Sequence, residues 1–157
     1  MPPTAADYDS LVRRLRVLED QEALRALMIR GWRALDRKDW QTWIAGWADD
    51  AVLEFGPWEQ IHGKDAVRAT VEAAEAPYPS MQHHLLNMHF DVDGDRATGI
   101  GYMWFVAVTE AGKTSSPYAM GGPYDWEFSR GPNGWLLTRQ RLGVWWTQGE
   151  DAVKAFE

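Results

Sequence analysis

The sequence predicts a single α+β domain, in which a cone-shaped, curved antiparallel sheet wraps around N-terminal helices and encloses an apolar pocket. Three observations lead to this prediction. Apolar residues in the first fifty positions recur at helical spacing, and the chain from Met81 onward reads as long strands separated by turns. No repeat, linker or low-complexity segment divides the 157 residues, so we expect residues 1–157 to form one domain. Helices followed by a meander of strands are typical of the α+β class.

The N-terminal region predicts three helices. Apolar residues at helical spacing form two series, Leu11, Leu15 and Leu18, and then Leu24, Met28, Trp32 and Leu35. Asp20 is the expected cap between the first helix and the second. Asp39 is the expected cap of a short third helix, which ends near Asp49 and carries Trp40, Trp43 and Trp47.

The rest of the chain predicts one more helix and five strands. Gly63–Ala74 alternates valines with small and charged residues, which is typical of a short amphipathic helix. The predicted strands are Ala51–Phe55, Met81–Val92, Ala97–Thr109, Tyr118–Phe128 and Trp135–Thr147. Turn residues separate the last four strands, so we expect these strands to form an antiparallel meander. Such a sheet curls, and helices over its concave face would enclose a cavity.

Composition and charge exclude several classes of function. The net charge of −7 argues against nucleic acid as a partner, because phosphate binding needs a basic face. The chain has no cysteine, which rules out disulfides and thiolate metal sites and suits a cytoplasmic location. No apolar stretch is long enough to span a bilayer, and Met1–Asp9 does not resemble a signal peptide, so we expect no membrane partner.

Tryptophan is unusually frequent, with ten residues in the chain. Most of these rings are expected to build the core. Ten indoles do not all pack well in a small domain, however, and surplus rings often line a ligand cavity or an oligomer interface. The composition therefore favours a pocket suited to flat, aromatic molecules.

Asp36 lies on the apolar face of the predicted second helix, four residues after Trp32. A buried carboxylate is costly alone, and so is a buried imidazolium, but the two can stabilise each other. A carboxylate that orients a histidine is the minimal equipment of a general base. The alternative is a surface aspartate that caps the next segment or pairs with Arg33 or Arg37, although Asp39 is the better cap.

His83 and His84 point to opposite faces of their predicted strand, so at most one of them faces the cavity. Strict alternation favours His84, because it groups that residue with Leu86, Met88, Phe90 and Val92. A bulge would reverse the assignment, since one inserted residue changes the face that follows. Both histidines are therefore candidates, and a structural role is the alternative for each.

Asp36, His83–Asn87 and Val92–Ala97 together resemble the SnoaL-like branch of the nuclear transport factor 2-like superfamily. The resemblance covers nearly the whole chain, from Leu18 to Trp135. The order and spacing of these motifs are more specific for the fold than for a reaction. This branch includes scytalone dehydratase, bile acid 7α-dehydratase and hexachlorocyclohexane dehydrochlorinase. The resemblance implies a cone of curved sheet around helices, with a deep apolar pocket.

The resemblance also implies roles for the acid and the histidine. In these dehydratases and the dehydrochlorinase, an aspartate late in the second long helix orients a histidine on the first meander strand, and the histidine takes a proton from carbon. Asp36 matches that aspartate. A histidine four residues before an asparagine selects His83, with Asn87 completing the motif. The resemblance thus favours His83 over His84.

The helper residues of these enzymes are absent from this chain. The tyrosines that hold the catalytic water in scytalone dehydratase correspond to Leu35 and Phe55, and the helpers of the other two enzymes fall near Gly31. We therefore expect the acid or oxyanion partner elsewhere. Tryptophan N–H groups are one possibility, and the stronger candidates are Tyr102, Tyr118 and Tyr124.

The sequence as a whole predicts a cofactor-independent lyase of the dehydratase type that acts on a small, largely apolar and aromatic substrate. An isomerase or polyketide-type cyclase with the same two residues, or a non-catalytic ligand-binding module, are the alternatives. No motif indicates a metal or a cofactor, and we expect neither. We expect a homodimer or homotrimer formed through the outer sheet face. The expected catalytic residues are Asp36, His83 and His84. The expected substrate-binding residues are Trp32, Trp40, Phe55, Asn87, Tyr102, Trp104, Tyr118, Tyr124 and Trp145.

Overall fold

The computed structural model describes residues 3–56 and 58–156 and confirms the predicted α+β class. Its helices are α1 (Ala5–Asp36), α2 (Trp40–Ile44) and α3 (Lys64–Glu75). Its strands are β1 (Trp47–Phe55), β2 (Ile61–His62), β3 (Ser80–Asp93), β4 (Arg96–Val108), β5 (Tyr118–Gly131), β6 (Gly134–Leu142) and β7 (Trp146–Gln148). Within the described residues, no helix has both the length and the apolar character that crossing a bilayer requires.

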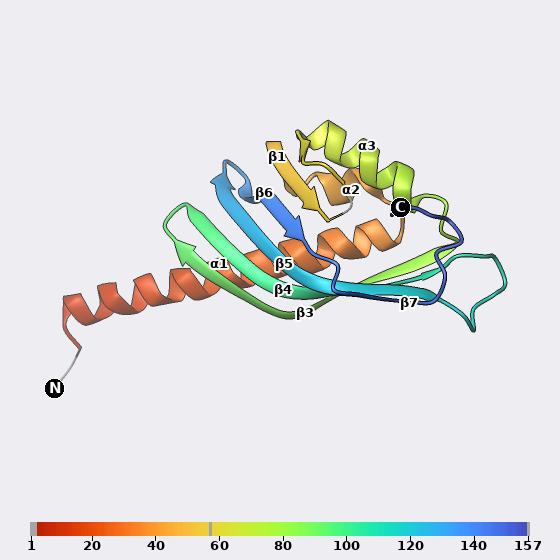
Figure 1. Ribbon diagram of the computed structural model, residues 1–157. Helices are drawn as coiled ribbons and strands as arrows, with labels where there is room; N and C mark the ends of the chain where they lie inside the picture. The colour runs from red at the N-terminus through yellow and green to blue at the C-terminus, as the bar shows by residue number, and fades with distance from the viewer. Residues whose placement is uncertain (1–2, 57, 157) are drawn as a thin grey trace.

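The strands form one sheet in the order β2-β1-β6-β5-β4-β3, with β7 paired to β5. Strands β3 to β6 form the predicted antiparallel meander. β1 runs parallel to β6, so the sheet is mixed, whereas a purely antiparallel sheet was expected. The sheet curves around the C-terminal half of α1, and α2 and α3 close the space at one end (Figure 1). This arrangement creates the concave interior in which the candidate site lies.

Helix α1 is continuous, which corrects the predicted break at Asp20. The Asp20 carboxylate does not cap a helix; it accepts two hydrogen bonds from the Arg130 guanidinium, at 3.0 and 2.8 Å, and one from the Trp135 indole at 3.0 Å. Both partners are more than a hundred residues away in the sequence, so local capping rules do not anticipate them. The helix therefore continues to Asp36, where its last turn reaches β3.

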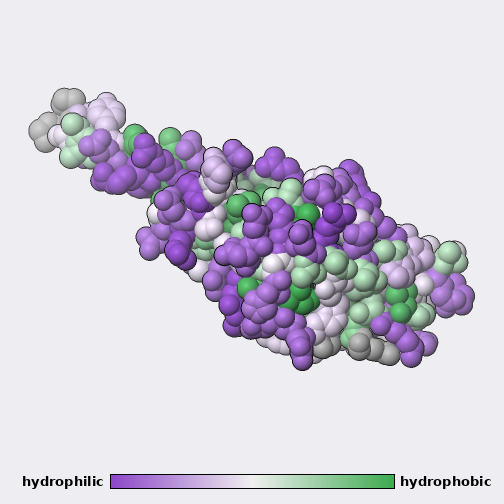
Figure 2. Space-filling view, turned by 90° about the horizontal axis from the view of Figure 1, so that it is seen from above, coloured by the Kyte–Doolittle hydropathy of each residue, from purple (hydrophilic) through white to green (hydrophobic). Residues whose placement is uncertain are grey.

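The N-terminal half of α1 extends beyond the sheet (Figure 1). Thr4 and Asp7 form a capping box that starts the helix. The first predicted leucine series is exposed here, and Figure 2 shows polar and apolar side chains together on this projecting part. The buried residues of the helix are Leu24, Met28, Trp32, Ala34 and Leu35. Only the second apolar series therefore packs into the core, and this packing fixes the position of Asp36.

Asp39 caps α2 as predicted, since its side chain accepts a hydrogen bond from the Thr42 N–H at 3.1 Å. The helix ends at Ile44, and Trp47 begins β1 instead of continuing the helix. The prediction for Trp47 was wrong because its buried ring fits an inward position of a strand as well as a helical face. The strand begins four residues earlier than predicted.

The last predicted strand is divided into two. β6 ends at Leu142, and after a short break the chain continues along the same edge of β5, where β7 pairs with it. Within this break, the Gly143 N–H donates to the Pro123 carbonyl at 3.0 Å. A Cβ at Gly122 would overlap the Gly143 oxygen, so the close approach of the two backbones requires a glycine at this position. The predicted Trp135–Thr147 strand missed this turn.

The core lies between the concave sheet face and the helices. Three indole rings dominate one part of it. Trp32 lies 6.4 Å from Trp43 and 6.3 Å from Trp47, measured between ring centroids, and Trp43 lies 5.4 Å from Trp47. Such contacts add to the free energy gained by burying the rings. They also hold the last two turns of α1 against β1, which fixes one wall of the site.

Candidate active site

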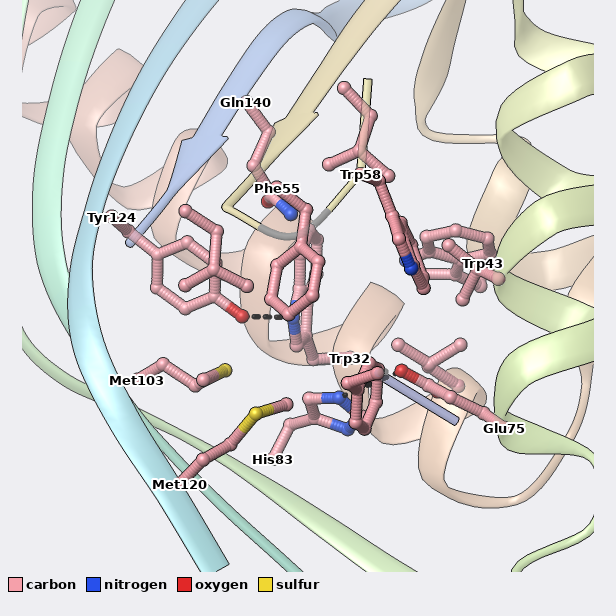
Figure 3. Close-up of a pocket in the computed structure, with 15 residues that line it drawn as sticks. Trp32, Trp43, Phe55, Trp58, Glu75, His83, Met103, Met120, Tyr124 and Gln140 are labelled. Atoms are coloured by element: carbon pink, nitrogen blue, oxygen red, sulfur yellow. Dashed lines mark hydrogen bonds and ion pairs between the residues drawn. The ribbon is translucent and has the colours of Figure 1, made fainter. Parts of the chain in front are cut away.

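A cavity of about 40 Å³ lies between α1, α3 and the concave sheet face. Apolar side chains form most of its wall, and four polar residues interrupt them, namely Glu75, His83, Tyr124 and Gln140. The apolar residues of the wall are Trp32, Leu35, Trp43, Leu53, Phe55, Trp58, Val71, Met103, Met120, Leu142 and Phe156. Figure 3 shows His83, Glu75 and Tyr124 on different sides of this space. A mostly apolar cavity with few polar groups is typical of a small-molecule site.

Asp36 and His83 are in direct contact beside the cavity. One carboxylate oxygen of Asp36, Oδ1, lies 2.8 Å from His83 Nδ1 and accepts the His83 backbone N–H at 2.9 Å. The side chains of His83 and Asp36 are only 4% and 9% exposed. Because the carboxylate oxygen faces Nδ1, that nitrogen carries a proton and Nε2 is directed away from Asp36. The fold thus brings together two side chains that lie 47 residues apart in the sequence.

Glu75 is the functional candidate that the sequence analysis missed. It is the last residue of α3, its side chain is 8% exposed, and its Oε1 lies 3.4 Å from His83 Nε2. Its other oxygen, Oε2, is buried and has no hydrogen-bond partner within the described part of the chain. The predicted helix stopped at Ala74. Continuing the four-residue spacing of Val67 and Val71 by one turn would have placed Glu75 on the same inward face.

His83 therefore lies between two carboxylates, one at each ring nitrogen. Burial alone would lower the pKa of His83, because it disfavours the charged imidazolium. The negative charge of Glu75 and the hydrogen bond to Asp36 outweigh this effect and raise the pKa of His83 to about 9. The ring therefore favours a second proton on Nε2, the nitrogen that faces Glu75.

Tyr124 supplies a second polar group with a free donor. Its hydroxyl accepts a hydrogen bond from the Trp32 indole N–H at 3.2 Å, and its ring is fully buried (Figure 3). Burial raises the pKa of Tyr124 above its usual value, so the hydroxyl keeps its proton. Since its oxygen already accepts from Trp32, the hydroxyl hydrogen is available to an acceptor in the cavity.

A bulge in β3 decides which histidine faces the cavity. The register with β4 shifts between Leu86 and His89, so that one extra residue lies on β3. His83 consequently points inward, while His84 lies on the other face with its Nδ1 2.9 Å from the Trp104 carbonyl oxygen. The alternation argument for His84 failed because it counted through the bulge. Asn87 lies within the bulge and is exposed, so it does not line the cavity.

Three predicted substrate-binding residues lie on the outer sheet face. Tyr102, Trp104 and Trp145 are exposed there and do not line the cavity. They were misassigned because aromatic content alone does not say which face of a strand is covered. Leu86 and Ile100 extend this exposed patch. Patches of this kind are typical of interfaces, and the homo-oligomer through this face stays a prediction.

The remaining predicted binding residues divide between the cavity wall and the core. Trp32, Phe55 and Tyr124 line the cavity, as expected. Trp40 is only partly buried and packs against the core, and Tyr118 is buried on β5, so neither reaches the cavity. Within the described residues, no group of histidine, cysteine, aspartate and glutamate side chains could hold a metal ion. The polar residues that line the cavity are proton donors and acceptors.

Comparison with known proteins adds a family and several similar structures. The model of the SnoaL-like domain family matches residues 16–141. No curated protein sequence matches the chain. A structure from Novosphingobium aromaticivorans, described as a candidate aromatic ring hydroxylase, has 25% identity and a TM-score of 0.75, with coverage of 87% of this chain and 98% of that one.

Two further structures show the same fold at lower identity. A candidate scytalone dehydratase from Novosphingobium aromaticivorans has 19% identity and a TM-score of 0.72, and the match covers 91% of each chain. LinA has 16% identity and a TM-score of 0.69, with coverage of 93% of this chain and 95% of that one.

Proposed function

Because the chain belongs to the SnoaL-like domain family, we propose that it is a cofactor-independent lyase that removes a proton from carbon in a small, largely apolar and aromatic substrate. The observation that carries the proposal is the 2.8 Å contact between Asp36 Oδ1 and His83 Nδ1. This contact leaves Nε2 as the nitrogen that can act on a substrate. In this reaction His83 is the base, and Asp36 is a positioning residue.

The first step is the transfer of a proton from a carbon next to a carbonyl group to His83 Nε2, which acts as a base once its own proton has passed to Glu75, 3.4 Å away. The Asp36 carboxylate stabilises the imidazolium that forms, because it already accepts the Nδ1 proton. Negative charge develops on the carbonyl oxygen, and the free hydroxyl hydrogen of Tyr124 is suited to stabilise it. A leaving group on the neighbouring carbon then departs, and a conjugated double bond forms.

The apolar lining of the cavity favours this class of substrate, but a substrate needs more space than the cavity offers. A free volume of about 40 Å³ holds only a few water molecules. Phe156 lines the cavity from the C-terminal segment, and its ring lies 5.4 Å from Phe55 and 5.9 Å from Trp58 between centroids. A flat substrate ring can replace Phe156 in this cluster of tilted rings, so we propose that this segment moves when substrate enters.

The proposal is tested with benzylacetone and its β-hydroxy derivative. In D₂O, the wild-type protein should exchange the α-hydrogens of benzylacetone, and it should convert the β-hydroxy ketone to benzylideneacetone with loss of water. The first reaction is followed by NMR and the second by ultraviolet absorbance. His83→Gln and Asp36→Asn should each slow exchange by roughly 10²–10⁴.

His84→Gln is the matched control, because His84 is adjacent in sequence but lies on the other face of β3. Its exchange rate should stay within about twofold of the wild type. Products of unchanged mass would assign the protein to isomerases or cyclases. Binding of both ketones without exchange in the wild type would favour a ligand-binding module and refute the lyase.

A further inference from the structure

We propose that Glu75 is the second proton-transfer residue of this site, which donates a proton to the leaving group and then recovers one from His83 by direct contact. This inference rests on the proposed lyase function, and it assigns the acid that the known helper residues do not supply here. It follows from the position of Glu75 and from the number of protons that the buried groups share.

The environment of Glu75 is unfavourable for a purely structural carboxylate. The side chain is 8% exposed and lines the cavity, and its nearest polar partner is His83 Nε2 at 3.4 Å. The Oε2 atom is buried and has no hydrogen-bond partner among the described residues. Buried polar groups without partners are costly and uncommon, and at a cavity wall they mark a position where a ligand group is expected to bind. A substrate hydroxyl could supply the missing partner of Oε2 once the cavity opens to admit the substrate.

The three ionisable groups of the site share a defined number of protons. Asp36 faces the Nδ1 proton of His83 and holds it in place. His83 Nε2 and Glu75 Oε1 lie 3.4 Å apart, so one further proton can pass between them. When this proton is on Glu75, Nε2 is a free base and Glu75 is a free acid. A substrate that binds against both groups therefore meets a base and an acid in neighbouring positions.

The reaction of a β-hydroxy ketone then balances within the site. His83 Nε2 takes the α-proton, the electrons of the C–H bond form the double bond, and the C–O bond breaks as Glu75 protonates the departing hydroxyl group. Water and the conjugated ketone leave. His83 is then an imidazolium and Glu75 a carboxylate, and the proton returns from Nε2 to Oε1 across their 3.4 Å contact. The site is restored without a proton from solvent, which suits a closed, apolar cavity.

The test compares two leaving groups in Glu75→Gln. Hydroxide needs a proton in order to leave, whereas acetate does not. For the wild type and each variant, the elimination rates of the β-hydroxy and β-acetoxy derivatives of benzylacetone are divided by the α-hydrogen exchange rate of benzylacetone. In Glu75→Gln, this ratio should fall about 100-fold or more for the hydroxy ketone and less than about tenfold for the acetoxy ketone.

Glu72→Gln is the matched control, because Glu72 lies on the same helix but is paired with Arg68 at the surface. Both of its ratios should equal those of the wild type. If Glu75→Gln lowers both ratios by the same factor, or leaves both unchanged, Glu75 is not the acid. Exchange catalysed by His83 would still support the proposed function in that case. Absence of exchange in every protein would overturn both proposals.

A second measurement does not depend on the probes entering the cavity. NMR titration of the His83 imidazole nitrogens reports whether Glu75 shares the Nε2 proton. In Glu75→Gln, the midpoint of this titration should move down by at least about one pH unit, while in Glu72→Gln it should stay at the wild-type value. An unchanged midpoint in Glu75→Gln would show that the two residues do not share a proton and would overturn the inference.

Discussion

Raising the pH from 6.5 to 9 should destabilise the folded protein, because the buried site holds one proton that the unfolded chain does not. In the unfolded chain, the pKa of His83 is about 6.5, whereas the negative groups around the buried ring raise it to about 9. Between these values the folded state binds more protons than the unfolded state, so the free energy of unfolding decreases as pH rises.

The magnitude follows from the two pKa values. One pH unit corresponds to about 1.4 kcal/mol, so the full difference is on the order of 3 kcal/mol. The stabilisation is complete below pH 6.5 and is lost above pH 9. The charged groups that face the ring are Asp36 from α1 and Glu75 from α3. The result is the same whether the proton is on Nε2 or on Glu75, because the calculation counts only protons bound by the site.

Urea unfolding followed by tryptophan fluorescence measures this effect at fixed protein concentration. The wild type and His83→Gln are compared at several pH values between 6 and 9.5. The wild type should lose about 1.4 kcal/mol per pH unit within this range relative to the variant. Burial raises the pKa values of the tyrosines Tyr78 and Tyr124, so these groups act above pH 10 and do not interfere. Equal pH dependence in the two proteins would show that His83 is not protonated in the folded state.

Two further substitutions test the packing that supports the site. Tyr124→Phe removes the acceptor of the Trp32 indole N–H, so it should lower the free energy of unfolding by about 1–3 kcal/mol, measured by urea unfolding; an unchanged value would mean that water replaces the hydroxyl. Gly122→Ala places a methyl group against the Gly143 backbone oxygen and should cost about 3 kcal/mol or more, measured by thermal unfolding. The helical control Gly31→Ala meets only ordinary contacts and should not destabilise the protein, whereas similar losses in both variants would contradict the steric argument.

The layers of the fold could be predicted from the sequence because they depend on local periodicity. The apolar spacing in the helices and the turn residues between the strands are local signals, and so is the Asp39 cap. The break expected at Asp20 and the full-length last strand were wrong because distant contacts decided them. Asp20 binds Arg130 across the molecule, and the break between β6 and β7 involves the close approach of Gly143 to Gly122. Neither contact can be recognised from the neighbouring residues in the sequence.

The two acids of the site differ in how readily the sequence reveals them. Asp36 could be found because it continues the four-residue spacing of the buried residues Leu24, Met28 and Trp32. Glu75 is the last residue of a short helix, and the predicted helix ended one residue earlier, so Glu75 was not assigned to its inward face. A glutamate is also expected at the surface by default. Only the approach of α3 to β3 shows that this one is buried against His83.

The asparagine of the histidine motif explains why two arguments from one sequence disagreed. Asn87 has a positive φ of 52°, a conformation that asparagine adopts more readily than most residues. It lies where the register of β3 shifts by one residue against β4. Counting back from the buried Phe90 in steps of two therefore assigns the residues before the shift to the wrong face of the sheet. An asparagine four residues after His83 thus marks the bulge that turns His83 inward, and its exposed side chain needs no contact with the substrate to have this effect.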